Sequence, residues 1–408
     1  MNSQSGAPFP ARLDIPSEVM AIARRLERAG HETWCIGGAV RDRLIGIPNN
    51  DVDLATSATP DQVQSLFRRT VPIGISHGTV AVLDRHNVAH EVTTFRKDVR
   101  TDGRHAEVTF GVSLEEDLAR RDFTFNAIAY HPGRHEWFDP HRGAEDLQTG
   151  IVRAVGVATR RFREDYLRIL RCVRFATRFG FAVERITWQA ARANGDGLAG
   201  LSAERVRDEW FKSLTHTKSV ATVCAMWSDV GAGRIWLAGI DLEEADGRAR
   251  IYALDRHNVR DPVFVTAYLS SDPGATLEKL RCSSAEIERG RRIAVFRADW
   301  PDVANPTSVR KWMSHVGDAV DDMILVARVD EAHAGLREVV EAVVASGAPL
   351  SQSQLAVNGS DLIRMGVPEG PEVGAMLKRL LNVVLEDPGR NRKSVLLQMA
   401  ADDGENTR

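Results

Sequence analysis

The most informative stretch of this chain is residues 33–42, which read Thr33-Trp34-Cys35-Ile36-Gly37-Gly38-Ala39-Val40-Arg41-Asp42. Four residues that favour a buried strand precede two glycines, and a helix start follows them. A turn without side chains lets backbone N–H groups approach a phosphate, and Arg41 adds a positive charge. Because two glycines after a strand more often form a plain tight turn, this stretch predicts a phosphate site only in combination with other motifs.

A pair of aspartates follows in Asp51-Val52-Asp53-Leu54. Successive side chains of a strand point to opposite faces, so Asp51 and Asp53 share one face while Val52 and Leu54 enter the core. Two carboxylates at one place repel each other unless a cation lies between them, and oxygen ligands on a rigid strand suit Mg²⁺ held partly by substrate phosphates. An exposed, solvated pair is the alternative. A glycine turn followed by such a pair is what nucleotidyl transfer from a triphosphate needs.

The texture of the sequence changes near residue 160. Before it, short apolar runs between turn residues indicate a mixed α/β domain. The predicted strands include Thr33–Ile36, Thr79–Leu83, Val88–Phe95, Ala106–Phe110 and Ile151–Val155, and helices are predicted near Val40–Ile45 and Thr59–Phe67. After it, helical periodicity begins with a helix over Arg161–Phe179, and the remainder is predicted to be entirely helical.

Composition limits the class of protein. The chain has 408 residues, 43% hydrophobic and 27% charged, which predicts a folded protein of two to four domains at about 100–200 residues each. Since 53 basic residues face 56 acidic ones, a polyanionic partner has to meet a local basic patch. The four cysteines are far apart and are predicted to be reduced thiols. Without an apolar signal segment or membrane span, a cytoplasmic location is expected.

Two further motifs carry candidate binding residues. Residues 116–127 include Arg120 and Arg121, which are candidates for triphosphate oxygens, and Asn126, a candidate for a ribose hydroxyl or the phosphates. A solvated helix start fits these residues equally well. In the helix predicted from Arg161, Asp165 and Arg168 share a face at i, i+3 spacing.

The spacing of Asp165 and Arg168 suggests base recognition. Cytosine and adenine present an amine donor beside a ring-nitrogen acceptor, whereas uracil and guanine present the reverse order. A carboxylate next to a guanidinium therefore favours CTP and ATP over UTP and GTP without a template. The usual meaning of this spacing is a weak surface ion pair.

Taken together, the motifs resemble, in order, those of class II CCA-adding tRNA nucleotidyltransferases, which belong to the polymerase-β-like superfamily. The resemblance rests on residues 37–42, 51–53, 120–127, 139–143 and 164–168. Residues 201–206 are similar to the family's neck-helix motif, and residues 358–362 and 370–374 resemble the tail of many bacterial members. Between about Val220 and Leu350 no diagnostic match is found.

The resemblance implies an architecture and a reaction. It implies an α/β nucleotidyltransferase head with a mixed sheet at residues 1–155, an all-α neck for base recognition at 156–220, a helical body at 221–345 and a tRNA-binding helical tail at 346–408. The implied enzyme adds CMP, CMP and AMP from CTP and ATP to the 3′ end of tRNA and releases pyrophosphate. Its oligomeric state stays open.

The family's roles are carried over to the matching residues. Asp51 and Asp53 are the implied catalytic residues and ligands of two Mg²⁺ ions, and Glu91 is a candidate third carboxylate, although a glutamate on a strand is as often solvated. The implied nucleotide-binding residues are Gly37, Gly38, Arg41, Arg120, Arg121, Asp122, Asn126, Asp165, Arg168, Arg171 and Arg174. Arg171, Arg174 and Arg178 form a basic stripe that meets phosphates or is simply a solvated surface. Because phosphate binding needs local positive charge, tRNA contacts are expected at Lys378, Arg379, Arg390, Arg392 and Lys393.

Several relatives share this active site. CC-adding enzymes have a shortened loop, whereas residues 96–105 have full length here. Bacterial poly(A) polymerases carry a basic run after the carboxylate strand, whereas this chain has residues 72–80, from Pro72 to Val80. An A-adding enzyme remains the alternative, and a non-catalytic RNA-binding protein is disfavoured because it gains nothing from two mutually repelling carboxylates. No His-Asp dipeptide occurs, so no phosphatase activity is expected.

Overall fold

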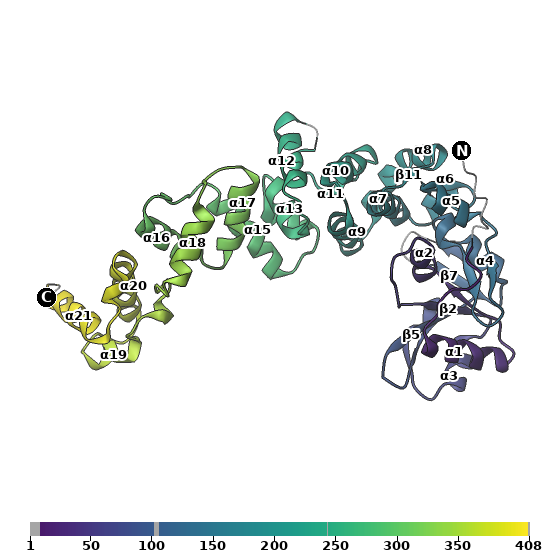
Figure 1. The fold of residues 1–408 in the computed structure, drawn as a ribbon, viewed down its shortest axis with the longest axis horizontal. Helices are drawn as coiled ribbons and strands as arrows, with labels where there is room; N and C mark the ends of the chain where they lie inside the picture. Colours follow the sequence, from purple (N-terminus) through teal and green to yellow (C-terminus); the bar gives the residue numbers. More distant parts are fainter. Residues whose placement is uncertain (1–8, 102–105, 243, 407–408) are drawn as a thin grey trace. The chain divides into compact units, whose positions relative to one another are not determined.

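The computed structural model describes residues 9–101, 106–242 and 244–406 (Figure 1). The chain divides into two compact units, Met1–Ala238 and Gly239–Arg408. The first unit holds every strand longer than one residue in the part of the chain that is described, and the second is built from helices. The α/β to all-α change predicted from the sequence is confirmed. The finer division at residues 155, 220 and 345 stays a prediction.

A mixed seven-stranded sheet forms the centre of the first unit, in the order β3-β4-β5-β2-β1-β8-β9. Its neighbours are antiparallel except for β2 and β5, which are parallel. Its strands are β1 (Thr33–Ile36), β2 (Asp53–Thr56), β3 (Thr70–Gly74), β4 (Thr79–Leu83), β5 (Ala89–Thr94), β8 (Ala129–His131) and β9 (Glu136–Phe138). Strands β1 and β2 are almost wholly buried, so the glycine turn and the first carboxylates start from the rigid middle of the sheet.

Four helices and a hairpin accompany this sheet. The helices are α1 (Ser17–Arg28), α2 (Gly38–Leu44), α3 (Pro60–Leu66) and α4 (Leu114–Ala119). Reciprocal side-chain and backbone bonds begin α3 at Thr59 and α4 at Ser113. Leu114 and Leu118 of α4 pack on Trp34 and neighbouring core side chains, which fixes the residues that follow α4. β6 (Arg96–Thr101) and β7 (Ala106–Phe110) pair separately, and residues 102–105 of the predicted full-length loop lie outside the described residues.

The rest of the first unit is helical apart from two short strands. Its helices are α5 (Gly143–Thr149), α6 (Ala158–Glu164), α7 (Leu167–Phe179), α8 (Arg185–Ala193), α9 (Ala203–His216), α10 (Val220–Asp229) and α11 (Ala232–Trp236). The strands β10 (Ile151–Val152) and β11 (Ala182–Val183) pair in parallel. The prediction of a strand over Ile151–Val155 is therefore too long, because residues 153–155 bond instead to the segment around Phe123.

One predicted helix is wrong in a way that matters for function. Instead of a continuous helix over Arg161–Phe179, α6 ends at Glu164 and α7 begins at Leu167. Asp165 is extended, with φ −155° and ψ 106°, and its carboxylate accepts a hydrogen bond from the Leu167 N–H. The side chain of Asp165 thus competes with the backbone for the N–H groups of the next turn. Because the apolar stripe continues across the break, periodicity alone did not reveal it.

The second unit carries ten α-helices within the described residues. They are α12 (Ala245–Arg256), α13 (Pro262–Leu269), α14 (Pro273–Lys279), α15 (Ser284–Phe296), α16 (Pro306–Val316), α17 (Val320–Val329), α18 (Leu336–Ala345), α19 (Gly359–Arg364), α20 (Pro371–Glu386) and α21 (Lys393–Asn406). Leu380 and Val384 of α20 pack with Leu362 of α19 and Leu396 of α21. None of the helices in the described chain is both long and apolar enough to cross a bilayer.

Candidate active site

A cavity of about 580 Å³ in the first unit gathers most of the residues singled out from the sequence. We call it the arginine pocket, because eight of the residues that line it are arginines and four are aspartates or glutamates. Its predicted members are Gly37, Gly38, Arg41, Asp53, Glu91, Arg120, Arg121, Asp122, Asn126, Asp165, Arg168, Arg171 and Arg174. Arg205, Arg96 and Phe175 also line it. Such a surplus of positive charge suits a polyanionic ligand.

The glycine turn lies directly against the carboxylate strand. Gly37 has φ +76°, and a Cβ atom there would lie 3.3 Å from Asp53 Oδ2 and 3.5 Å from Arg121 Nη1. Strand β1 places Ile36 beside Asp53 of β2. A side chain at position 37 would be strained by its backbone and would crowd both charged groups. The structure therefore joins the glycine turn and the DxD segment, which lie 14 residues apart along the chain, in one place.

The three carboxylates near the glycine turn differ in how deeply they are buried. Asp53 is partly buried on β2, whereas Asp51 is exposed, lies just before the strand and does not line the pocket. Glu91 lies on β5, and the parallel register of Leu54 beside Val92 brings it next to Asp53. Burial, followed by the charges of Glu91 and Asp51, raises the pKa of Asp53 to about 7.

This group of carboxylates fits a divalent cation that substrate phosphates help to bind. Among the described residues, no three His, Cys, Asp or Glu side chains are arranged to hold a metal by themselves. Carboxylate oxygens are the donors that hard cations such as Mg²⁺ prefer, and Mg²⁺ is commonly held by one or two carboxylates together with substrate phosphates. A cation would also offset the burial and the neighbouring carboxylates that raise the pKa of Asp53.

The arginine motif is anchored by a carboxylate that sequence reasoning passed over. Asp117 of α4 is 1% exposed and accepts hydrogen bonds from Arg120, Arg121 and the Arg96 N–H. Arg121 also donates to the Asn126 backbone carbonyl, at 3.3 Å. The buried Arg121 Nε has no hydrogen-bond partner within the described chain. A buried guanidinium N–H that lacks a partner is costly, which is consistent with a site built for an anionic ligand.

Asn126 and Asp122 are hydrogen-bonded to arginines of the pocket. The Asn126 side chain accepts a hydrogen bond from Arg41 at 2.6 Å and donates one to Asp122 at 2.9 Å. Asp122 also accepts from Arg171 Nε at 2.6 Å. Although burial opposes ionisation, Arg171 and Asn126 hold the pKa of Asp122 well below its usual range. The motif thus ties α2 and α7 to one buried carboxylate.

The predicted base-reading pair is brought to the pocket, but not as an ion pair on one helix. Asp165 lies at the break between α6 and α7, and its carboxylate binds Arg205 of α9 at 2.7 Å. Arg168 binds Glu164 at 3.0 Å and the Arg120 backbone carbonyl at 2.9 Å. The expectation of an adjacent Asp165–Arg168 pair on one helix face is wrong, because α6 ends before Asp165 and Arg168 belongs to α7.

Each arginine of the basic stripe on α7 forms one ion pair. Arg171 binds Asp122, Arg174 binds Glu209 of α9 at 2.5 Å, and Arg178 binds Asp42 of α2 at 3.3 Å. Arg171 and Arg174 line the pocket, whereas Arg178 does not. The alternative of a simply solvated surface stripe is wrong, since Arg174 is only 8% exposed.

The tail residues proposed for tRNA contact all belong to the second unit. Lys378, Arg379, Arg390, Arg392 and Lys393 are exposed. Arg390 forms an ion pair with Asp387 at 3.2 Å, and Lys393 forms one with Asp361 at 2.7 Å. Their role stays a prediction.

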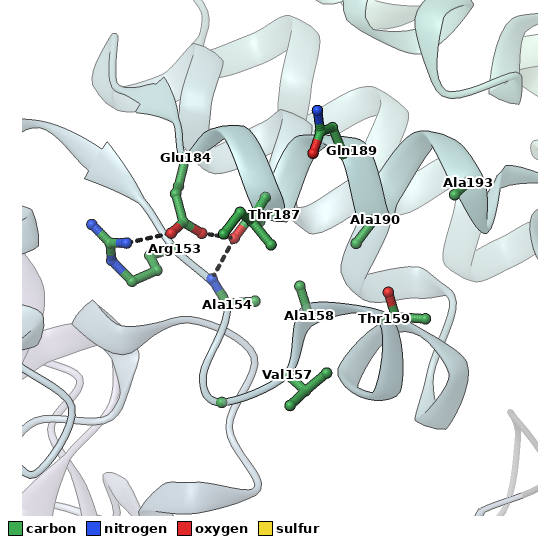
Figure 2. A pocket seen from close by; sticks show the side chains of 12 residues that line it. Arg153, Ala154, Val157, Ala158, Thr159, Glu184, Thr187, Gln189, Ala190 and Ala193 are labelled. Atoms are coloured by element: carbon green, nitrogen blue, oxygen red, sulfur yellow. Dashed lines mark hydrogen bonds and ion pairs between the residues drawn. The ribbon is translucent and has the colours of Figure 1, made fainter.

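A second cavity, of about 520 Å³, lies between α6 and α8 (Figure 2). We call it the alanine cavity, because Ala154, Ala158, Ala190 and Ala193 line it. Three hydrogen bonds join some of its polar groups: Arg153 donates to Glu184, Thr187 donates to Glu184 at 2.6 Å, and the Ala154 N–H donates to Thr187 at 3.1 Å (Figure 2). Among the described residues, its only charged lining residues, Arg153 and Glu184, are paired with each other, so it offers little to a charged substrate.

Family models match two parts of the first unit. A model described as the poly A polymerase head domain matches residues 33–153, which contain the glycine turn, the carboxylates and the arginine motif. A model described as the probable RNA and SrmB-binding site of polymerase A matches residues 180–229. The first match covers the sheet that positions the arginine pocket.

Similar proteins extend the match to most of the chain. The CCA-adding enzyme of Leuconostoc mesenteroides is 34% identical over 374 residues, 89% of this chain and 90% of that protein. The CCA-adding enzyme of Lactiplantibacillus plantarum is 48% identical over 215 residues, 51% of this chain and 52% of that one. A crystal structure of the Bacillus stearothermophilus CCA-adding enzyme in complex with CTP is 31% identical, with a TM-score of 0.76 over 96% of this chain and 98% of that one.

Proposed function

The chain belongs to the CCA-adding enzymes, a family of tRNA nucleotidyltransferases, and on this premise we propose how its arginine pocket carries out the reaction. The enzyme adds CMP, CMP and AMP, taken from CTP and ATP, to the 3′ end of tRNA without a template and releases pyrophosphate. The observation that carries our proposal is the meeting of Asp53, the arginine motif and Asp165 in one cavity. Those residues come from the sheet, the segment after α4 and the break before α7.

The carboxylates are the proposed metal-binding end of the pocket. Enzymes of this family use a divalent cation, and we propose Mg²⁺, held by Asp53 and Asp51 with Glu91 as the third carboxylate. When bound, such a cation lowers the pKa of the attacking hydroxyl and neutralises the leaving pyrophosphate. The chain's own part is to fix Asp53 and Glu91 on adjacent strands, next to the glycine turn.

The arginines are the proposed triphosphate-binding end. Arg121 keeps an unpartnered Nε in the described structure, and Asp117 holds it and Arg120 in place. Gly37 and Gly38 leave room for phosphate oxygens beside these guanidiniums. Fixed donors of this kind bind charge without having to reorganise during the reaction. Three more arginines of the pocket are proposed to bind the triphosphate: Arg41, which donates to Asn126, together with Arg171 and Arg174.

Asp165 and Arg168 are proposed to read the base from two different elements. Arg205 fixes the Asp165 carboxylate, and Glu164 and two backbone carbonyls engage three N–H groups of Arg168. A guanidinium has five N–H donors, so two remain for a base. A carboxylate acceptor beside those donors matches cytosine and adenine. Because their partners are separate, each group is oriented independently of the other.

We also propose that the exposed basic residues of the tail, Lys378, Arg379, Arg390, Arg392 and Lys393, contact tRNA phosphates. A cytoplasmic location is proposed with this function. All four cysteines are buried and form no disulfide, which fits a reducing compartment.

The test uses three tRNA transcripts, ending before CCA, after C and after CC. Purified enzyme is given each transcript with CTP and ATP singly and together. We expect all three to be completed to CCA. Extension of the CC-ended transcript alone would make it an A-adding enzyme, and long A tails would make it a poly(A) polymerase.

A further inference from the structure

One aromatic ring lies at the centre of the pocket's arginines. Phe175 of α7 is 2% exposed and lines the arginine pocket. The guanidinium carbons of Arg41, Arg171 and Arg174 lie over this ring, 5.0, 5.4 and 4.2 Å from its centroid. Neighbouring Phe179 carries Arg41 and Arg178 in the same manner, at 5.1 and 5.0 Å.

Each guanidinium over Phe175 is also held by a carboxylate. Arg41 binds Asp42 through Nε and Nη2. Arg171 and Arg174 use Nε, toward Asp122 at 2.6 Å and Glu209 at 2.5 Å. Within the described chain, no hydrogen bond uses the terminal nitrogens of Arg171 or Arg174. Each guanidinium has four N–H groups on its two terminal nitrogens, so Arg171 and Arg174 together offer eight to a ligand.

The ring of Phe175 offsets part of the repulsion between the three guanidiniums that lie over it. Three like charges packed around one point repel each other, and burial deprives them of solvation by water. The face of an aromatic ring carries partial negative charge and attracts cations without using up their N–H donors. A carboxylate in place of the ring would neutralise the guanidiniums and occupy those donors. A ring covered by three guanidiniums also has little free face on which a base could stack.

We propose that Phe175 is a positioning residue, which holds Arg41, Arg171 and Arg174 as a preformed cluster for the triphosphate. The inference rests on the proposed function of the pocket. It predicts that losing the ring weakens binding through the phosphates, equally for CTP and ATP, and leaves base choice unchanged.

The experiment compares two changes at position 175 with wild type. Phe175→Leu removes the ring, and 3,4,5-trifluorophenylalanine, introduced by nonsense suppression, keeps its shape but withdraws the negative charge from its face. Dissociation constants for CTP, ATP and inorganic tripolyphosphate are measured by calorimetry in the presence of Mg²⁺. We expect both variants to bind all three weaker, by about tenfold for leucine and less for the fluorinated ring. The ratio of CTP to UTP incorporation is expected to stay at the wild-type value.

Phe125→Leu is the matched control. Phe125 is fully buried, touches Phe175 edge-on at 5.4 Å between centroids, and carries no guanidinium over its ring in the described structure. We expect it to lower the melting temperature as much as Phe175→Leu while leaving the tripolyphosphate dissociation constant unchanged. Equal weakening by Phe125→Leu, or wild-type binding by the fluorinated variant, would overturn the positioning role. If wild type itself neither bound CTP nor extended tRNA, the function proposed for the pocket would fail instead.

Discussion

The arginine pocket and the alanine cavity are similar in volume, about 580 and 520 Å³, and lie in the same unit of the chain. They differ in how their polar groups are satisfied. In the alanine cavity, the only charged residues of the described lining, Arg153 and Glu184, form an ion pair, and Thr187 donates to the same carboxylate. In the arginine pocket, Arg121 keeps an unpartnered Nε, and the pKa of Asp53 is raised to about 7 by burial and by Glu91 and Asp51. The arginine pocket is therefore distinguished as the candidate active site by its unpartnered N–H group and its raised pKa, and not by its volume.

The largest contrast is expected from the carboxylates. Asp53→Ala removes the more buried ligand of the proposed metal pair, and we expect incorporation of CMP to fall at least about a thousandfold. Gel-based extension of tRNA transcripts measures it, with tRNA binding followed by filter retention. Binding is expected to stay near wild type, because the residues proposed to contact tRNA belong to the second unit. A variant that extends tRNA at even a tenth of the normal rate would contradict the assignment.

The next effect concerns base choice. Asp165→Ala is expected to reduce the preference for CTP over UTP by about a hundredfold, because the group that opposes the wrong base is lost. Single-turnover kcat/KM values for the two nucleotides give the ratio. Asp208→Ala, which removes an exposed carboxylate of α9, serves as the control and should keep the ratio. Unchanged discrimination in Asp165→Ala would exclude it as a base reader.

A smaller effect appears in stability and its pH dependence. The pKa of Asp53 rises from 3.8 in the unfolded chain to about 7 in the folded one, so the folded state binds more protons between these values. Without metal, the free energy of unfolding therefore falls as pH rises from 4 to 7. Asp53→Asn removes this penalty, and at pH 8 the metal-free variant should be more stable than wild type, by no more than about 4 kcal/mol.

Denaturant titrations of both proteins from pH 4 to 8 measure the difference. It should be small at pH 4, grow toward pH 7 and stay level above it. Adding Mg²⁺ should stabilise wild type and not the variant. If the free energy of unfolding changed with pH in the same way in both proteins, the pKa of Asp53 would not be raised in the folded state.

The smallest effect tests the alanine cavity. Thr187→Val leaves the Ala154 N–H without its partner and is expected to cost about 1–2 kcal/mol of stability. Its rate of CCA addition, measured at a temperature where both proteins are folded, should equal that of wild type. A marked loss of activity would mean that the alanine cavity takes part in function and would remove the contrast between the two cavities.

The sequence predicts those parts of the pocket that depend on local patterns, such as strand alternation and helical periodicity. The change from strands to helices was visible in the periodicity. Alternation placed Asp53 on a strand beside the pocket, but the prediction that Asp51 shares that strand is wrong, because β2 begins at Asp53. Sequence reasoning could not reach pairs made between elements: Asp165 with Arg205, Arg174 with Glu209 and Arg171 with Asp122 are separated by 40, 35 and 49 residues. Phe175 was hidden for a related reason, since its position in an apolar helix resembles any core residue. Asp117 looked like part of an ordinary acidic first turn.

The three arginine pairs of α7 have a consequence for redesign. Asp122, Glu209 and Asp42 belong to three different parts of the first unit, and each grips one arginine of the same helix. Sliding that helix would break all three bonds at once, so a new substrate preference is not gained by shifting it. To change the preferred nucleotide, side chains should be altered at the break between α6 and α7, and the three ion pairs of α7 should be kept.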